Sequence, residues 1–235
     1  MCKVINVPRS HDYIYGGTIM SSCRLCGPDF SAEYWNEPLF ESENFLVIPS
    51  LGALLEGWLL LLPKAHYICV GALPSSLIDE MEGIKQMAAN FILEVYGAVR
   101  VFEHGPHEGN RSVGCGVDHA HLHLVPTSSD LLSAVSAFLP TEVTWKTGDV
   151  ADCRESFDQS KDYLYLEQPI GIRWIATHNQ FQGQLFRQAI ASELGVLSQY
   201  NWREFEHLNN VKATIAQART WNKNRQCPTE VKTAA

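Results

Sequence analysis

Three histidines alternate with apolar residues between His119 and Pro126, where the chain reads His-Ala-His-Leu-His-Leu-Val-Pro. Successive side chains of a β-strand point to opposite faces, so an extended segment places all three imidazoles on one face. Neighbouring imidazoles would stand about 7 Å apart, which is twice the rise per residue. The intervening Ala120, Leu122 and Leu124 would face a core. The pattern predicts a strand whose titratable face can engage one metal ion or one phosphoryl group.

The length and charge of the chain limit what it can be. Its 235 residues, 46% of them hydrophobic, suffice for one large domain or for a medium domain with a substantial extension. The formal net charge of −8 argues against an extended surface that follows a nucleic-acid backbone. A small nucleotide held in a local pocket is compatible with this charge.

The cysteines and the first residues indicate the compartment. Seven cysteines are an odd number without the spacing of a disulfide framework, which favours free thiols in a reducing cytoplasm. The N-terminal residues run into polar side chains instead of an apolar signal segment. The longest strongly apolar run, from Trp58 to Leu62, is far shorter than a membrane span. We therefore expect a cytoplasmic protein with no membrane partner.

Strands and one long helix are predicted in the first half. Apolar runs at 45–48, 58–62 and 99–102 have the length of short buried strands. Apolar residues at three- and four-residue steps predict an amphipathic helix between 74 and 97. This order of elements favours an α+β fold, in which the long helix packs on an antiparallel sheet.

A change of pattern after Pro126 predicts an α+β C-terminal extension. The elements expected there are a helix from Ser129 or Asp130 to Leu139, a loop-rich stretch at 146–161, a hairpin of strands 163–166 and 172–176, and helices at 182–194 and 211–219. The chain is thereby divided into an arm (1–20), a main domain (21–128), the extension (129–223) and a disordered tail (224–235).

Two cysteines, Cys23 and Cys26, form a Cys-x-x-Cys knuckle upstream of the histidines. By itself the knuckle is a zinc half-site, a redox pair or two free thiols. A structural zinc ion takes four cysteine or histidine ligands in a tetrahedron. The candidates for the other two ligands are His66, just after a predicted strand, and one member of the histidine triplet.

Two segments together resemble the histidine-triad (HIT) superfamily. They are Gly57 to His66, with its Pro-Lys-x-His ending, and His119 to Pro126. The resemblance covers about residues 20–128. Its zinc-bearing branch includes Hint-type, Fhit-type and galactose-1-phosphate uridylyltransferase proteins, which hydrolyse or transfer nucleotidyl groups. It implies a HIT-like antiparallel sheet and a structural zinc ion, Zn²⁺, held by four ligands: Cys23, Cys26, His66 and His119.

The resemblance also implies how the site works. His121 would attack the α-phosphorus through a neutral ring nitrogen and form a nucleotidyl-histidine intermediate. Its other ring nitrogen would donate to the backbone carbonyl of His119. His123 would contact the phosphate and donate hydrogen bonds to developing negative charge. Backbone N–H groups of Gly114, Cys115 and Gly116 would approach the phosphate as well.

Four positions depart from the family pattern. Glu103 stands where relatives often carry Asn or Gln near the leaving group, and Gly116 stands where Ser or Thr often supplies a hydroxyl. Ser50 occupies the place of the ribose-binding Asp or Asn, and Trp58 replaces a frequent His. We expect Glu103 and Ser50 in the nucleotide pocket, and we expect the four departures to affect the identity of the substrate more than the chemistry.

The extension faintly resembles that of CwfJ-type HIT proteins, which are associated with RNA lariat processing. Arg187 lies in a helix that is otherwise apolar on one side, so it is either a phosphate ligand or a structural arginine. His178, between Thr177 and Asn179, is typical of a turn residue. Single-domain HIT proteins pair as homodimers, so the resemblance implies a homodimer unless the extension covers the pairing surface.

Four functions are compatible with these residues. The leading hypothesis is a HIT hydrolase of nucleoside polyphosphates of the diadenosine polyphosphate kind, or of nucleotide conjugates such as phosphoramidates. The second is a nucleotidyltransferase or phosphorylase with phosphate or a sugar phosphate as acceptor. The third is a nucleotide- or RNA-binding module without turnover. The fourth is a catalytic metal centre that uses all three triad histidines.

Overall fold

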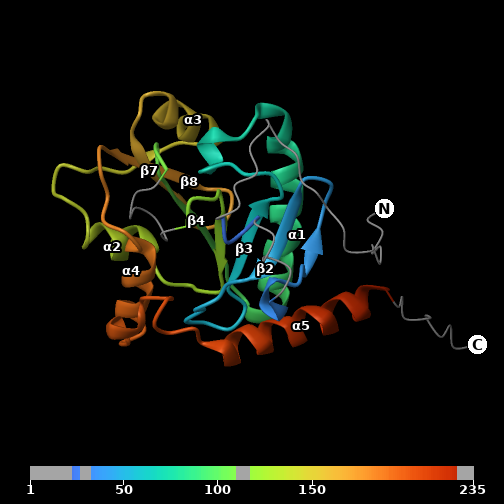
Figure 1. Ribbon diagram of the computed structural model, residues 1–235. Coiled ribbons are helices and arrows are strands. Elements are labelled where there is room, and N and C mark those ends of the chain that lie inside the picture. Colours follow the sequence, from blue (N-terminus) through green and yellow to red (C-terminus); the bar gives the residue numbers. More distant parts are fainter. Residues whose placement is uncertain (1–22, 27–32, 110–116, 227–235) are drawn as a thin grey trace, which may run out of the picture.

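The computed structural model describes residues 23–26, 33–109 and 117–226 (Figure 1). Its centre is an eight-stranded sheet with the order β1-β2-β3-β5-β4-β7-β8-β6, in which every pair of neighbours is antiparallel. The strands are β1 (Phe40–Glu41), β2 (Phe45–Pro49), β3 (Leu59–Pro63), β4 (Arg100–Gly105), β5 (Leu122–Val125), β6 (Lys146–Thr147), β7 (Asp162–Glu167) and β8 (Arg173–His178). The expected α+β fold with an antiparallel sheet is confirmed.

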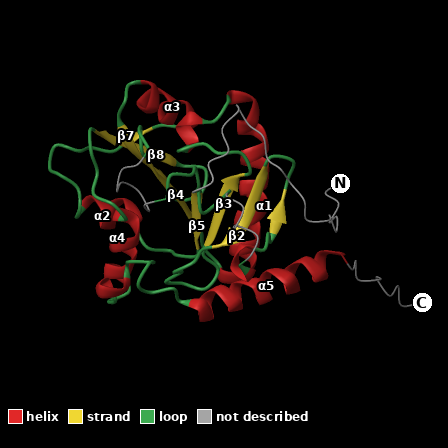
Figure 2. Ribbon diagram, in the orientation of Figure 1, coloured by secondary structure: helices red, strands yellow, loops and turns green. Residues whose placement is uncertain are grey.

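Helices cover both faces of this sheet (Figure 2). They are α1 (Ile78–Tyr96), α2 (Leu131–Ser136), α3 (Val150–Asp158), α4 (Leu185–Glu193) and α5 (Leu208–Gln226). The 3₁₀ turns are η2 (Tyr34–Asn36), η3 (Val70–Ala72), η4 (Ser75–Leu77) and η5 (Leu197–Gln199). Helix α1 ends as its sequence predicts, because Gly97 adopts a left-handed conformation with φ of 86° and its N–H bonds the carbonyl of Leu93.

One face of the sheet packs against α1, α3 and α5. Strand residues such as Leu61, Val101 and Leu124 meet the apolar side of α1 in this core. Helix α5 lies beside α1, where Trp221 packs edge-on against Phe91 with ring centroids 5.7 Å apart. Leu122 and Leu124 of the histidine strand face this core. The alternation expected from the sequence therefore holds for these apolar side chains.

The opposite face is divided between two coverings. Over β4, β7 and β8 it packs against α2 and α4, with Phe102 stacked on Phe186 at a centroid distance of 4.2 Å. Over β2 and β3 a small cluster forms around Leu25, Ile48 and Leu62. Figure 1 shows α4 on the side of the sheet away from α1. His121 and His123 belong to this divided face, at the junction of its two parts.

The extension is continuous with the main sheet. Strand β7 pairs along β4, with Glu103 opposite Tyr165, so the sheet crosses the boundary that the sequence places after residue 128. A buried ion pair between Lys85 of α1 and Glu167 of β7 further ties the two parts together. The edge of β4 opposite β5 is therefore paired with β7, a strand of the same chain.

The loop-rich stretch expected at 146–161 was wrong, because it contains β6 and α3. Helix α3 begins with a capping box, in which Asp149 accepts from the N–H of Ala151 and Asp152 reaches back to the N–H of Asp149. It buries only Cys153 and Ser156, so its sequence lacks a long apolar stripe.

Helix α5 is longer than the expected 211–219 and runs into the expected tail. Its last turns are polar and exposed, and Arg225 forms an ion pair with Glu94 of α1 at 2.8 Å. The expected arm at 1–20 and the tail after Gln226 lie outside the described residues. Among the helices that are described, none combines the length and apolarity of a membrane-spanning segment.

Candidate functional site

The three histidines of the triplet do not share one strand face. Strand β5 starts only at Leu122, so His119 and His121 lie in the bend that leads into it. The N–H of Ala120 donates to the carbonyl of Tyr67 at 2.6 Å, which holds this bend against the chain that follows β3. The expectation of three imidazoles on one strand face was therefore wrong. His119 turns toward the knuckle, whereas His121 and His123 line a cavity.

A candidate metal centre forms around the knuckle. One ligand atom each of Cys23, Cys26, His66 and His119 lies within 4.8 Å of all the others. The Cys23 Sγ is 3.5 Å from the His119 Nδ1, and the Cys26 Sγ is 3.4 Å from the His66 Nδ1. These separations fit four ligands around one tetrahedral ion, because metal–ligand bonds to sulfur and nitrogen are about 2.0–2.3 Å long. The four residues are those that the family resemblance implies.

Two features of the cluster prepare it for a metal ion. The Nε2–H of His119 donates to the carbonyl of Pro63 at 2.8 Å, which leaves the Nδ1 without a proton and turned toward the sulfur atoms. A hydrogen bond from Cys26 lowers the pKa of Cys23 to about 3, against the effect of burial, and the same bond raises the pKa of Cys26. This shift favours the thiolate of Cys23, which is the form of cysteine that binds metals.

His121 holds the opposite tautomer. Its Nδ1–H donates to the carbonyl of His119 at 2.5 Å, so the Nε2 is the ring nitrogen without a proton. Burial lowers the pKa of His121 to about 4, although the bond to this carbonyl works in the other direction. His121 is only 9% exposed and lines the cavity. It is therefore a neutral imidazole with an electron pair available at the cavity wall.

His123 is fixed by aromatic neighbours. The indole Nε1–H of Trp58 donates to its Nδ1 at 3.0 Å, so a neutral ring carries its proton on Nε2. Its ring stacks on Phe102 at a centroid distance of 4.7 Å and meets His121 edge-on at 4.9 Å. Burial, and then the nearby His121 and Arg187, lower the pKa of His123 well below its usual value. Trp58 thus orients the imidazole as a donor toward the reaction site.

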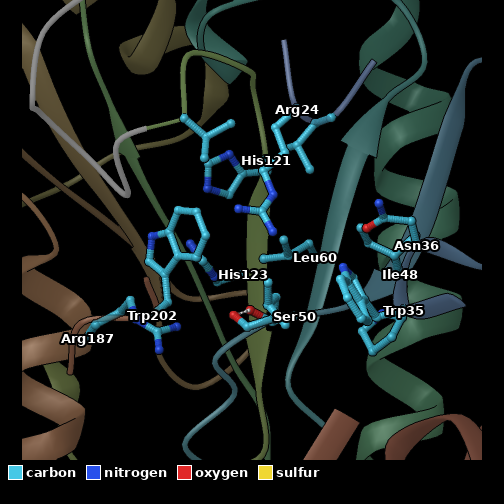
Figure 3. Close-up of a pocket in the computed structure, with 14 residues that line it drawn as sticks. Arg24, Trp35, Asn36, Ile48, Ser50, Leu60, His121, His123, Arg187 and Trp202 are labelled. Carbon is cyan, nitrogen blue, oxygen red and sulfur yellow. Dashed lines mark hydrogen bonds between the residues drawn. The ribbon is translucent and has the colours of Figure 1, made fainter. Parts of the chain in front are cut away.

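A cavity opens beside these rings, lined by residues of β2, β3 and the C-terminal extension. Figure 3 shows Trp202 and Arg187 on one side of it and Trp35 and Asn36 on the other, with the two histidines between them. The remaining lining residues that bear on recognition are Arg24, Ile48, Ser50 and Leu60. Two indole rings therefore flank a space next to the unprotonated nitrogen of His121.

Ser50 and Arg187, for which the sequence suggests nucleotide contacts, both line this cavity. The hydroxyl of Ser50 donates to the carbonyl of Leu51 at 3.3 Å within the cavity wall. Arg187 is 1% exposed, donates from its Nε to the carbonyl of Tyr200 at 2.9 Å and also bonds the carbonyl of Gly52. Its guanidinium lies 4.9 Å from the ring centre of Trp58. Arg187 is thus an internal cation of the cavity wall.

Glu103 lies on the other face of the sheet, away from the cavity. Its carboxylate accepts from the N–H of Val70 at 2.8 Å, from the hydroxyl of Tyr163 and from the backbone N–H of His121. Burial raises its pKa to about 7, although these bonds act in the opposite direction. The structure therefore places Glu103 behind the backbone of His121 and not next to a bound phosphate.

The remaining expected phosphate ligands, Gly114, Cys115 and Gly116, lie outside the described residues. The sequence analysis did not single out Trp35, Asn36 or Trp202 as cavity residues. Trp35 and Asn36 belong to η2, which has no motif of its own. Trp202 reaches the cavity from the C-terminal extension. Its position depends on how the extension packs against the sheet, which the sequence does not reveal.

Comparisons with known proteins give structural matches only. No family model matches this chain, and no curated protein matches it. A HIT family protein from Bacillus anthracis is 20% identical, with 46% of this chain and 75% of that chain covered and a TM-score of 0.39. A zinc-bound histidine triad family protein from Mycobacterium smegmatis is 21% identical over 59% of this chain and 94% of its own, with a TM-score of 0.38.

The chain resembles histidine-triad proteins. A structure described as a uridylyltransferase is 9% identical and covers 90% of this chain and 94% of its own, with a TM-score of 0.40. With TM-scores below 0.5, the matches establish neither an activity nor a substrate for this chain. The likeness of the extension to CwfJ-type proteins stays a prediction.

Proposed function

We propose that this protein is a HIT-type enzyme that hydrolyses nucleoside polyphosphates or nucleotide conjugates through a nucleotidyl-histidine at His121. The observation that carries the proposal is the hydrogen bond from the Nδ1–H of His121 to the carbonyl of His119. It leaves the Nε2 unprotonated at the wall of the cavity. An imidazole that is buried, neutral and oriented in this way is suited to nucleophilic attack on phosphorus.

The reaction divides into two displacements. First, the Nε2 of His121 bonds to the α-phosphorus while the bond from phosphorus to the leaving oxygen breaks. The Nε2–H of His123, set by the donation from Trp58, donates a hydrogen bond to the negative charge that develops on the oxygens, and the leaving phosphate departs as an anion. Second, water attacks the α-phosphorus and releases a proton to solvent, the phosphorus–nitrogen bond breaks, and the electron pair returns to the Nε2 of His121.

The wall of the cavity supports a nucleotide as substrate. Trp35 offers a flat apolar face on which a base can stack, whereas the ring of Trp202 packs against the guanidinium groups of Arg24 and Arg203, 4.9 Å and 4.8 Å from its centre. The buried guanidinium of Arg187 supplies positive charge near the triad, which favours a phosphate. Asn36 has an amide that can donate to or accept from the edge of a base.

The metal ion in this proposal is zinc, bound by Cys23, Cys26, His66 and His119. Two sulfur and two nitrogen ligands at these separations suit zinc. When bound, a zinc ion with four protein ligands supplies structural support and has no open position for chemistry. It would fix the backbone carbonyl of His119, and that carbonyl sets the tautomer of His121. The arrangement does not favour a catalytic metal on all three triad histidines, since only His119 belongs to the described cluster.

Two alternative functions are compatible with the same residues. A nucleotidyltransferase or phosphorylase would use the same first step with a different acceptor. A binding module without turnover was suggested by Glu103 and Gly116. The position of Glu103 behind the sheet, where its charge does not face the cavity, weakens that suggestion.

The proposal is tested by trapping the intermediate. The zinc-loaded protein is mixed with a diadenosine polyphosphate, a nucleoside phosphoramidate or a nucleotide sugar and quenched in base, which preserves phosphoramidates. Mass spectrometry then locates any nucleotidyl adduct. We expect an adduct on His121 with at least one substrate class, also in the control His178→Ala, and none in His121→Ala. Tight binding of all three classes without an adduct or turnover would instead favour the binding module.

A further inference from the structure

The cavity beside His121 is positively charged although the chain as a whole is acidic. The formal net charge of the chain is −8. Two arginines, Arg24 and Arg187, line the cavity, and its described lining residues include no aspartate or glutamate. Positive charge that no neighbouring carboxylate balances raises the local concentration of anions. The charge of the cavity therefore favours a ligand that carries several negative charges.

The two arginines differ in how their donors are used. Arg187 is buried and donates to the backbone carbonyls of Gly52 and Tyr200, so part of its donor capacity holds the cavity wall together. Arg24 is exposed, and no described residue hydrogen-bonds to its guanidinium or forms an ion pair with it. The N–H donors of Arg24 are therefore available to a ligand in the cavity.

The position of Arg24 is set from two sides. Its backbone belongs to the turn between Cys23 and Cys26, two of the four candidate metal ligands. Its guanidinium lies 4.9 Å from the ring centre of Trp202, which comes from the C-terminal extension. The guanidinium of Arg203 lies 4.8 Å from the same ring. We therefore assign Trp202 as a positioning residue that holds Arg24 at the cavity wall.

We propose that Arg24 binds the β-phosphoryl group of the substrate, so that the bond cleaved at the α-phosphorus is a phosphoanhydride and not a phosphoramidate. This inference rests on the proposed function, because that function places the α-phosphorus at His121. Arg24 and His121 line the same cavity, and Figure 3 shows both at the same end of it. A planar guanidinium can donate to two oxygens of one phosphoryl group.

Arg24 distinguishes the two bond types through the charge of the leaving group. When a phosphoanhydride reacts with His121, the bond from the α-phosphorus to the bridging oxygen breaks and its electron pair stays on that oxygen. The leaving phosphate gains negative charge, to which the N–H groups of Arg24 donate hydrogen bonds without losing a proton. A phosphoramidate instead releases an amine, which takes up a proton and carries no negative charge. Arg24 gives that reaction no such assistance.

Binding of uncleavable nucleotides tests the proposal without turnover. The probes are the α,β-methylene diphosphates of adenosine and uridine and the corresponding monophosphates, titrated into the full, zinc-loaded chain by calorimetry. Arg24→Gln removes the charge at the cavity. Arg203→Gln is the matched control, because it removes the other guanidinium beside Trp202, which does not line the cavity. We expect Arg24→Gln to weaken diphosphate binding by about tenfold to a hundredfold and monophosphate binding by less than about threefold. The control should bind both as the wild type does.

Turnover provides a second measurement. We expect Arg24→Gln to lower kcat/KM for a diadenosine polyphosphate by a similar factor and kcat/KM for an adenosine phosphoramidate by less than about threefold. Because Arg24 adjoins two candidate metal ligands, the metal content and the thermal unfolding temperature of each variant are measured as well. If Arg24→Gln loses zinc, Trp202→Leu replaces it, since this substitution frees the Arg24 side chain without a change in the turn. It should weaken diphosphate binding selectively by about threefold to tenfold.

The outcomes separate this inference from the proposed function. Equal weakening of monophosphates and diphosphates in a zinc-loaded Arg24→Gln, or no weakening of either, would overturn the β-phosphoryl site. Faster turnover of phosphoramidates than of polyphosphates by the wild type would overturn it as well. If an adduct on His121 forms in these cases, the proposed function stands with a different leaving group. A loss in Arg24→Gln that is selective for diphosphates, without any adduct, supports the site in a protein that binds nucleotides but does not cleave them.

Discussion

His119 and His121 lie two residues apart and serve opposite purposes. His119 gives its Nε2–H to the carbonyl of Pro63 and turns its Nδ1 toward two sulfur atoms. His121 gives its Nδ1–H to the carbonyl of His119 and turns its Nε2 toward the cavity. We propose that the same side chain serves as a metal ligand or as a nucleophile according to which of its ring nitrogens donates to a backbone carbonyl.

This difference also explains why the two sites are linked. The carbonyl that sets the tautomer of His121 belongs to the residue held in the metal cluster. In the proposed enzyme, a His119 held by the metal cluster would therefore keep His121 in one orientation, although the metal would not itself contact the substrate. The proposed roles can therefore be tested separately, by a substitution of His121 or by a substitution of one of the metal ligands.

The largest expected effect comes from the nucleophile. His121→Ala should lower kcat/KM by about 10³-fold or more, because the covalent route is lost. The metal content and the thermal unfolding temperature should stay close to those of the wild type, since His121 is not part of the metal cluster. Steady-state kinetics and metal analysis measure both. A variant that lost its metal would show that the two histidines are not separate in function.

Removal of the support should act on stability first. Cys23→Ser should lower the zinc content and reduce the free energy of unfolding by on the order of 4 kcal/mol, less than in a small zinc finger because this chain has a larger core. Activity per folded molecule should fall much less than in His121→Ala. Denaturant titration with metal analysis checks this. A full equivalent of zinc in the variant would refute the assignment of the ligands.

The third prediction concerns Glu103, which lies on the face of the sheet opposite the cavity. Its pKa is raised from 4.5 to about 7 in the folded chain, so the native state binds the proton more tightly than the unfolded state between these values. The free energy of unfolding contributed by Glu103 is therefore full below pH 4.5 and declines as the pH rises to 7, by about 3 kcal/mol. Glu103→Gln should remove this decline. Equal pH slopes of unfolding in variant and wild type would contradict the burial of this carboxyl.

The smallest effect is expected at Trp58. Trp58→Phe keeps a ring beneath Arg187 but removes the donor to the Nδ1 of His123. Because His123 is then free to carry its proton on either nitrogen, kcat should fall by about tenfold, with little change in KM. Kinetics at several pH values test this. An unchanged kcat would mean that the proton position of His123 does not matter for the reaction.

Much of the fold was predictable from local patterns. The apolar runs of β2, β3 and β4 and the stripe of α1 have clear periods, and the elements formed where those periods lie. Helix α3 was missed because its stability comes from a capping box instead of an apolar stripe. The true length of α5 was missed because its last turns depend on contacts with α1, such as Arg225 with Glu94, that no local pattern reveals.

The candidate site was also predictable only in part. All four expected metal ligands lie together in the structure. They were predictable because the two-cysteine knuckle and the histidine after Pro-Lys are recognisable in the sequence. Glu103 was expected in the pocket because the family position was carried over without regard to strand parity. It shares the face of Val101, which packs toward α1, whereas Phe102 and His104 face the triad. Arg187 and Trp202 reach the cavity only through the packing of the extension.

The opposite tautomers of His119 and His121 are open to direct measurement. In the zinc-loaded chain with ¹⁵N-labelled histidine rings, long-range proton–nitrogen correlation spectra at neutral pH assign the protonated nitrogen of each ring. We expect His119 to carry its proton on Nε2, with Nδ1 bound to metal, and His121 to carry its proton on Nδ1. A spectrum in which both rings hold the same tautomer, or in which His121 shows the shift of a metal ligand, would contradict the account.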